Sequence, residues 1–241
     1  MGVIKYLAWD SRFFGIKIGK VITSGRQTST KRISDVIKWA RKENYKCLYS
    51  EIPVGKLFLL KDILKNNFLL VDFKVTLSKT LEFKKLKRPA GVQNAQKDDG
   101  YFTDLIGIAD QVAMFSRYSR DPRFGKIQAK RLYREWLRKS FFSHFSDHFL
   151  IYKNKGIPTA FLTIRIKKHI PFIDLIGVSK KMRGKGIGGK LLSSVEQELY
   201  KKGFRQLRVV TQGENKNALI FYEQKGFRVE KITIFFHKWL N

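Results

Sequence analysis

The sequence predicts a mixed α/β fold, in which helices pack on a central sheet, and three observations support this class. Segments with strand-like and helical apolar spacing follow one another in residues 101–241 in the order α-α-β-β-β-α-β-α-β. Two of these strands flank Asn154-Lys155-Gly156, a hairpin signal, so part of the sheet is expected to be antiparallel. The helix–strand–helix–strand order of residues 197–238 occurs once before, in residues 38–79.

The individual elements follow from local spacing. Ile187, Leu191, Val195 and Leu199 lie on one face of a helix expected at Ile187–Lys202, and Gly203 ends it. Further helices are expected at Thr103–Ser116, Ile127–Phe142 and Ala218–Gln224. Strands are expected at Phe149–Lys153, Thr159–Lys167, Phe172–Val178, Gln206–Thr211 and Val229–Lys238.

The composition is that of a folded protein with a sizeable core. Of its 241 residues, 43% are hydrophobic and 14% are aromatic. The apolar stretches are far shorter than the roughly 20 residues of a membrane span, and the N-terminus lacks the apolar run of a signal peptide. The one cysteine, Cys47, excludes an internal disulfide and is typical of a reducing cytoplasm, where we expect the protein.

The chain is strongly basic, with 49 Lys and Arg residues against 20 Asp and Glu and a net charge of +29. Such an excess favours anionic partners of any kind, including phosphorylated small molecules and nucleic acid. The charge is spread along the whole chain, however, as in a solvated lysine-rich surface. Zinc-ligand spacing, an RNP-like aromatic pattern and a localised basic helix are all missing. The sequence therefore argues against a nucleic-acid-binding module, which stays the alternative from another functional class.

An internal repeat determines the expected domain organisation. Adding 159 to each number places residues 38–79 on 197–238 without a gap, although chance similarity between two amphipathic segments is the alternative. Two turn residues of the first copy, Asn44 and Asn67, then fall on glycines. The first copy lacks a glycine loop, so the chemistry is expected in the second. We predict a truncated domain at 1–83, a polar linker at 84–100 and a catalytic domain at 101–241.

A glycine-rich loop follows one predicted strand and opens a predicted helix. It consists of Arg183, Gly184, Lys185, Gly186, Ile187, Gly188 and Gly189. Backbone amides in such a loop can approach an anion closely, and the positive end of the helix dipole favours the anion. The dinucleotide pattern G-x-G-x-x-G fits, but the next strand ends at Gln212 without the required acid. The Walker pattern fits as far as Lys190 but has Leu191 in place of the metal-binding hydroxyl. No metal site is expected.

Two motifs resemble the GNAT superfamily of N-acetyltransferases. Its [QR]-x-x-G-x-[GA] loop is matched by Arg183, Gly186 and Gly188 after Val178. Its N-x-x-A-x-x-x-Y-x-x-x-G-F segment is matched by Asn215, Ala218, Tyr222, Gly226 and Phe227. The resemblance covers about residues 74–241 and implies the GNAT fold, a mixed and mostly antiparallel sheet with helices on both faces. Here a truncated GNAT-like half would precede that fold.

The resemblance implies acetyl-CoA as the co-substrate. The backbone of the loop from Arg183 to Gly189 would hold its pyrophosphate. The strand edge at Ile176, Gly177 and Val178 would pair with the pantetheine arm, and its N–H groups would stabilise the oxyanion. Asn215 would contact the cofactor or only cap its helix. The small side chain of Ala218 would leave room for the cofactor's arm.

The resemblance also names candidate catalytic groups. Tyr222 is expected to protonate the departing thiolate, as the family's tyrosine at this position is proposed to do. A packed aromatic on an amphipathic helix is the alternative. Asp174 stands where some members carry an acid and is the candidate general base, with a structural or solvated carboxylate as the alternative. His144, His148 and His169 are further candidate proton acceptors.

Two further segments resemble the dTDP-fucosamine acetyltransferase group, which acetylates amino groups on nucleotide-linked deoxysugars for surface polysaccharides. They are Trp9-Asp10-Ser11 with Phe13-Phe14-Gly15, and Ser116-Arg117-Tyr118 with Asp121-Pro122-Arg123-Phe124. The forked guanidinium groups of Arg117, Arg120 and Arg123 suit a diphosphate. Together with Phe14 and Tyr118, these arginines are the candidate residues that bind the acceptor. A solvated basic turn beside core aromatics is the alternative.

The sequence thus predicts an N-acetyltransferase that moves an acetyl group from acetyl-CoA to a phosphorylated acceptor, namely a nucleotide-linked (dTDP or UDP) amino sugar. A GNAT enzyme that acts on another amine, such as a protein N-terminus, a ribosomal protein or an aminoglycoside, is the alternative within enzymes. The sequence indicates neither the sugar epimer, the acyl chain nor the oligomeric state, and a homodimer is compatible with it.

Overall fold

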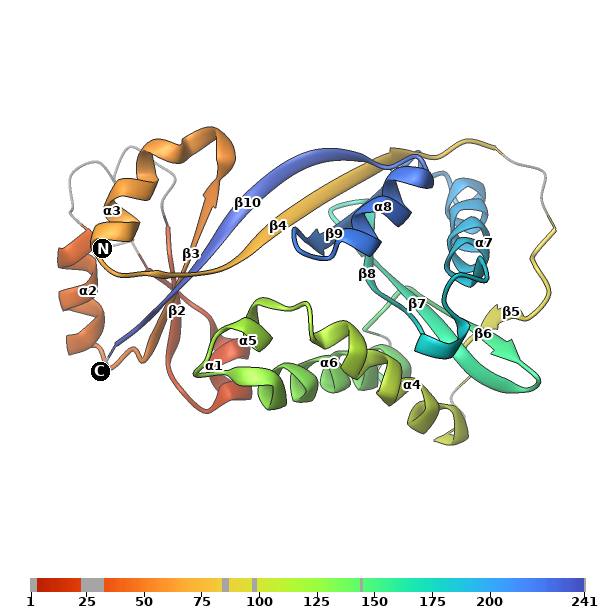
Figure 1. Ribbon diagram of the computed structural model, residues 1–241, viewed down its shortest axis with the longest axis horizontal. Helices are drawn as coiled ribbons and strands as arrows, with labels where there is room; N and C mark the ends of the chain where they lie inside the picture. The colour runs from red at the N-terminus through yellow and green to blue at the C-terminus, as the bar shows by residue number, and fades with distance from the viewer. Residues whose placement is uncertain (1–3, 23–32, 84–86, 97–98, 144, 241) are drawn as a thin grey trace. The chain divides into compact units, whose positions relative to one another are not determined.

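The computed structural model describes residues 4–22, 33–83, 87–96, 99–143 and 145–240 (Figure 1). These residues form two compact units. Unit 1 comprises the described residues of Met1–Val75, Arg117–Gln128 and Lys231–Asn241, and unit 2 comprises those of Thr76–Ser116 and Ala129–Glu230. Neither unit is one continuous stretch of chain. The contiguous division expected from the sequence, at 83 and 100, stays a prediction.

Unit 1 is built on a mixed sheet in the strand order β1-β2-β3-β10-β4. β2 runs parallel to β3, whereas β1 with β2 and β3 with β10 are antiparallel. Its elements are β1 (Ile4–Tyr6), α1 (Ala8–Phe14), β2 (Ile18–Val21), α2 (Ile33–Lys42), β3 (Cys47–Pro53), the 3-10 helix η2 (Val54–Leu59), α3 (Leu60–Lys65) and α5 (Arg117–Arg120), together with parts of β4 (Leu69–Thr80) and β10 (Arg228–Trp239).

The two faces of the unit 1 sheet bury different kinds of side chain, because successive strand residues point to opposite faces. On one face Leu48 and Phe236 pack with α2 and α3 in an apolar cluster. On the other face Tyr49 stacks on His237, with ring centroids 4.4 Å apart, and Phe124 lies against both rings. The second face is therefore aromatic and polar.

A buried charge network lies on this second face. His237 and Asp121 are both fully buried, and their Nδ1 and Oδ2 atoms are 2.6 Å apart. The indole of Trp239 and the backbone N–H of Arg123 also donate to Asp121, at 2.9 Å each. Burial raises the pKa of Asp121, but these donors outweigh it and the net direction is downward. Burial lowers the pKa of His237 to about 4, despite the neighbouring carboxylate. The imidazole is therefore neutral at pH 7.

The internal repeat appears in the element ends. Adding 159 to the bounds of β3 gives 206–212, which are the bounds of β9 (Gln206–Gln212), and the same shift carries β4 onto β10. The ends of α2 and α3 likewise fall on the last residues of α7 (Ile187–Lys201) and α8 (Lys216–Gln224). The turn residues also coincide: Asn44 and Gly203 both have positive φ, as do Asn67 and Gly226. The counterpart of the glycine loop, 24–30, lies outside the described residues.

Unit 2 has the strand order β10-β4-β9-β8-β7-β6-β5. Its pairs β5–β6, β6–β7 and β7–β8 are antiparallel, and β8 and β9 are parallel. Besides β9, α7 and α8, its elements are β5 (Val92–Asn94), α4 (Asp99–Ala113), most of α6 (Gly125–Phe142), β6 (His148–Asn154), β7 (Ile157–Lys167), β8 (Ile170–Val178) and the 3-10 helix η3 (Lys180–Met182).

The structure confirms the predicted α/β class, with helices on both faces of a mixed sheet. The expected hairpin is present, since Lys155 and Gly156 both adopt positive φ between β6 and β7. β5 lies inside the segment expected as a linker, and only its pairing with β6 makes it a strand. Within the described residues, no helix is both long and apolar enough to cross a membrane.

We predict that His237 makes unit 1 sensitive to mild acid. Its pKa of about 4 in the folded chain lies below the unfolded value of about 6.5, so the unfolded chain binds the extra proton between these values. The contribution of the neutral His237 to the free energy of unfolding is therefore present above pH 6.5 and is lost as the pH falls. Between pH 6.5 and 5 this amounts to about 2 kcal/mol. Urea denaturation followed by tryptophan fluorescence should show this loss in the wild type and a smaller loss in His237→Asn. Parallel pH curves would contradict the prediction.

Candidate active site

The strands β8 and β9 part soon after they meet. Their ladder consists of two pairs, Phe172 with Arg208 and Ile173 with Val209, within the described chain. β8 continues beyond Ile173 to Val178, and β9 continues to Gln212. This edge of β8 is therefore not occupied by β9. It includes the predicted cofactor-pairing residues Ile176, Gly177 and Val178.

A bulge in β8 accompanies the parting. Thr163 of β7 pairs with Leu175 and Ile164 pairs with Ile173, so Asp174 is one extra residue on β8. The fully buried Thr163 hydroxyl accepts a hydrogen bond from the Leu175 amide at 3.1 Å. A bulge bends its strand and increases the local twist. Thr163 could not be predicted from the sequence, because a threonine in a strand carries no signal of a bulge across the ladder.

The glycine loop adopts the conformation that its sequence requires. Gly184 and Gly186 have φ values of +77° and +72°, a region that residues with a Cβ rarely adopt. Gly186 is the N-cap of α7, and its carbonyl accepts from the Lys190 amide at 3.1 Å. No side chain caps this helix end within the described residues. The amides of the first turn are therefore free for an anion, and the helix dipole favours one there.

Three other glycines serve close packing. A Cβ on Gly177 would lie 2.6 Å from Ile108 of α4. A Cβ on Gly188 would lie 3.3 Å from the Phe221 ring of α8 and 3.9 Å from Val178. The end of β8, the start of α7 and helix α8 therefore meet at Gly188. Gly189 is less closely packed, because a Cβ there would meet only the flexible end of the Lys225 side chain, at 3.1 Å.

Arg183 holds the loop in place by its side chain. Its Nε donates to the carbonyl of Val178 at 3.0 Å, and its Nη2 donates to Gln111 of α4 at 2.7 Å. The loop is thus tied to the end of β8 and to α4. Gln111 could not be predicted from the sequence, because its contact joins residues 72 positions apart.

Asn215 caps helix α8. Its side-chain oxygen accepts a hydrogen bond from the Ala218 amide at 3.2 Å, so the capping role is observed. Its predicted contact with the cofactor stays a prediction.

Tyr222 is buried on α8, one turn after Ala218. Its ring packs edge-on against Phe221 and Phe227, with centroids 5.3 and 5.4 Å away. Within the described part of the chain its hydroxyl makes no hydrogen bond. Burial raises the pKa of the phenol, so that it is protonated at neutral pH. It is available as a proton donor.

Asp174, the candidate base, is held by two cations. Its Oδ2 lies 2.6 Å from Arg165 Nε and its Oδ1 lies 3.2 Å from Lys167 Nζ. The guanidinium of Arg165 also lies over the ring of Phe145. This arrangement agrees with the structural alternative, and the role of Asp174 as the base stays a prediction.

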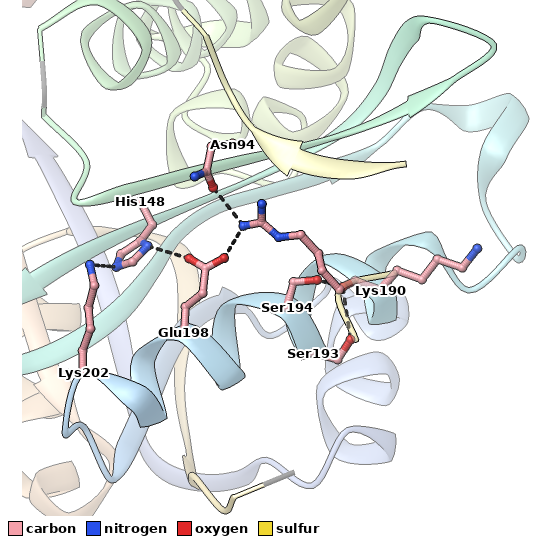
Figure 2. A network of polar contacts seen from close by, with 8 residues as sticks. Asn94, His148, Lys190, Ser193, Ser194, Glu198 and Lys202 are labelled. Atoms are coloured by element: carbon pink, nitrogen blue, oxygen red, sulfur yellow. Dashed lines mark hydrogen bonds and ion pairs between the residues drawn. The ribbon is translucent and has the colours of Figure 1, made fainter. Parts of the chain in front are cut away.

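The candidate histidines have other partners or positions. His148 of β6 lies between Glu198 of α7 and Lys202, which directly follows that helix: its Nδ1 is 3.1 Å from Glu198, and its Nε2 is 3.1 Å from Lys202 (Figure 2). Glu198 also accepts from Arg88. Glu198 follows the start of α7 by eleven residues, about 16 Å along the axis, so His148 belongs to the far end of this helix. His169 has positive φ in the turn before β8. His144 lies outside the described residues.

The predicted acceptor residues all lie in unit 1. Phe14 packs against Tyr118 and Phe124, with ring centroids 5.2 and 4.5 Å away. The three arginines have different surroundings. The guanidinium of Arg117 lies among aromatic rings, Arg120 is 4.0 Å from Asp72, and Arg123 lies over the Trp239 ring. Each of these guanidinium groups thus has a different neighbour. Their predicted shared role stays a prediction.

Comparisons with known proteins agree on one family. The Acetyltransferase (GNAT) family model matches residues 112–227. The Bacillus subtilis spore coat polysaccharide biosynthesis protein SpsD is 26% identical over 124 residues, which cover 52% of this chain and 43% of that protein. An uncharacterized N-acetyltransferase of Methanocaldococcus jannaschii is 25% identical over 173 residues, which cover 68% of this chain and 72% of that protein.

A solved structure shows the same fold. The GCN5-related N-acetyltransferase from Sphaerobacter thermophilus has a TM-score of 0.65 and 14% identity, over 98% of this chain and 76% of that one. The matched segment spans less than half the length of SpsD. The matched glycine loop, the parted strands and Tyr222 all lie within the family match. Residues 112–227 therefore match the acetyltransferase (GNAT) family, and the chain has the fold of a GCN5-related N-acetyltransferase.

Proposed function

We propose that the chain transfers an acetyl group from acetyl-CoA to the primary amine of a nucleotide-linked amino sugar. The observation that carries the acetyl transfer is the meeting of three elements at Gly188. These are the free end of β8 at Val178, the uncapped start of α7, and α8 beside Tyr222. They supply a strand edge, an anion site and a proton donor.

The residues present fit acetyl-CoA, which supplies an acetyl group activated as a thioester. The free amides at the start of α7 suit its phosphates, and Lys185 and Lys190 add positive charge at the same place. The free edge of β8 at Ile176, Gly177 and Val178 suits an extended amide-bearing arm, because its backbone groups can form strand-like hydrogen bonds. N–H groups of this edge can also stabilise developing negative charge on a carbonyl oxygen.

Tyr222 would give its proton to the departing thiolate. A thiol has a pKa of about 8.5 and an unperturbed phenol about 10, so the donation assists the reaction without being compulsory. Burial raises the pKa of Tyr222, which keeps the phenol protonated but makes it a weaker acid. Asp174 stays the candidate base that accepts the proton of the attacking amine. Because its carboxylate is already paired with Arg165 and Lys167, a relay of water molecules would serve equally as the acceptor of that proton.

Three features favour a nucleotide-linked amino sugar as the acceptor. The segments at Trp9–Gly15 and Ser116–Phe124 resemble the dTDP-fucosamine acetyltransferase group. The relative SpsD is named for polysaccharide biosynthesis in the spore coat. The net charge of +29 suits a phosphorylated acceptor. Another amine is the alternative, and we place the activity in the cytoplasm, in keeping with the buried free thiol of Cys47.

We predict that the acceptor must carry a diphosphate. Release of coenzyme A from acetyl-CoA should be measured over dTDP- and UDP-linked amino sugars, the free amino sugars, an aminoglycoside and a peptide with a free N-terminus. Charge-assisted hydrogen bonds to the diphosphate should raise kcat/KM at least roughly tenfold over the free sugar. If the peptide or the aminoglycoside were the best substrate, the proposed class of acceptor would be wrong, whereas the proposed acetyl transfer would still hold.

We predict that Gly186→Val abolishes acetyl-CoA binding while the protein stays folded. The backbone at Gly186 has φ of +72°, which a β-branched residue does not tolerate, so the free amides of the loop would move. Gly156→Val is the matched control, because Gly156 has φ of +82° and equally open surroundings in the β6–β7 turn. Calorimetry should show loss of affinity in the first variant only. Unchanged affinity in Gly186→Val would exclude binding through the loop backbone.

We predict that Tyr222→Phe lowers kcat at least about tenfold, within the range of 10²–10⁴ that general acid catalysis contributes. The substitution keeps the ring contacts with Phe221 and Phe227 and removes only the hydroxyl. Acetyl-CoA affinity and melting temperature should therefore change little. The assay needs single-turnover conditions in which the chemical step limits the rate. A wild-type rate there would assign Tyr222 to packing alone.

A further inference from the structure

Unit 1 contains a cavity of about 510 Å³ that none of the steps above uses. It lies on the aromatic and polar face of the sheet, the face to which Tyr49 belongs. Five cationic side chains line it, against two carboxylates. The cations are Lys5, Lys20, Lys56, Arg117 and Lys231.

The two carboxylates already have partners inside unit 1. Glu51 forms an ion pair with Lys20 at 2.8 Å, and Asp10 accepts a hydrogen bond from the Tyr118 hydroxyl at 3.1 Å. Three of the lining lysines make no ion pair within the described part of the chain: Lys5, Lys56 and Lys231. The cavity therefore has a positive charge that its own acids do not balance.

Arg117 is the innermost of these cations. Its guanidinium carbon lies 4.7 Å from the ring centroids of Tyr49, Tyr118 and Phe235. Rings favour the flat faces of a guanidinium but accept none of its five in-plane N–H donors. One donor reaches the Tyr118 hydroxyl at 2.7 Å, and the buried Nε has no acceptor among the described residues. No carboxylate forms an ion pair with Arg117 in the described chain, so its in-plane edge is suited to an oxyanion.

Tyr49 supplies a second, independent unsatisfied group. Its side chain lines the cavity and is only 1% exposed, and its hydroxyl has no hydrogen-bond partner among the described residues. A buried donor without an acceptor costs stability, so natural structures contain few of them. Burial raises the pKa of the phenol, which keeps it a proton donor. A ligand oxygen in the cavity would satisfy it.

We infer that this cavity binds the phosphate or diphosphate group of a small molecule through Arg117 and Tyr49, with Lys5, Lys56 and Lys231 at its rim. The site itself stands on these contacts. Its assignment to the diphosphate of the nucleotide-linked acceptor rests on the proposed function. Of the three arginines grouped by the sequence, Arg117 is the one that lines this cavity.

Calorimetry on the full chain tests the site without any turnover. The probes are dTDP, inorganic pyrophosphate and thymidine, which lacks phosphate. We expect dTDP and pyrophosphate to bind and thymidine not to bind. Binding of pyrophosphate alone would keep the anion site and remove the nucleotide as its ligand. Dissociation constants above about 1 mM for both anions would overturn the inference.

Variants locate the binding. Tyr49→Phe keeps the ring and removes the unsatisfied hydroxyl, and Arg117→Gln removes the charge; each should weaken the anions at least roughly tenfold. Lys17→Gln is the control, because it removes the same charge from unit 1 at a lysine that contacts Glu43 and does not line the cavity. It should change affinity less than about twofold. Should Arg117→Gln fail to fold, Tyr49→Phe still decides.

The glycine loop is the other candidate phosphate site. The variant Gly186→Val distinguishes binding at this loop from binding in the unit 1 cavity. Anion binding that persists in Gly186→Val and is lost in Tyr49→Phe supports the cavity. The reverse pattern would assign the phosphate to the loop and overturn the inference. Equal weakening in Lys17→Gln and Arg117→Gln would also overturn it, since general charge would then account for binding. Acetyl transfer is not needed for any of these outcomes.

Discussion

The parting of β8 from β9 is the constraint on which the candidate active site of unit 2 depends. In a continuous parallel ladder the backbone groups of β8 that face β9 would all be paired, and no edge would remain for another molecule. The ladder stops after Ile173, at the point where Asp174 is inserted as a bulge. The hydroxyl of Thr163 stabilises the bulge from β7. The unoccupied edge then leads directly to the loop that opens α7.

The glycines around this opening meet two different physical demands. Gly184 and Gly186 supply backbone conformations that other residues rarely adopt. Gly177 and Gly188 instead remove a Cβ that would collide with, or crowd, Ile108 and Phe221. The first pair determines the path of the loop, and the second determines how closely α4 and α8 approach β8 and α7. A glycine-rich motif is therefore a composite of conformational and packing requirements.

The same order of helix, strand, helix and strand has different roles in the two copies of the repeat. In unit 2, β9 of the repeat parts from β8 at the opening, and α8 of the repeat carries Tyr222. In unit 1, the corresponding β3 and the end of β10 bury an aspartate–histidine pair and line a basic cavity. The net charge of +29 has a local counterpart in that cavity, where the lysines outnumber the acids that could neutralise them.

The sequence by itself determined the main elements of residues 101–241, the repeat and the candidate cofactor site, because each depends on residues close together in the chain. Helical spacing placed Ala218 and Tyr222 one turn apart, and the glycines between Arg183 and Gly189 marked the loop. The offset of 159 predicted that the ends of β3 and β4 would coincide with those of β9 and β10, as they do.

Only the tertiary structure decided which side chains meet. The bulge at Asp174 depends on the register with β7, and β5 is a strand because β6 pairs with it. The cation partners of Asp174, the aromatic surroundings of Arg117 and the pair of Asp121 with His237 join residues up to 118 positions apart. Apolar periodicity reports which face of an element is buried, but it contains no information about the partner across that face. For this reason the candidate cofactor loop could be predicted from sequence, whereas the surroundings of the candidate base and of the candidate acceptor arginines could not.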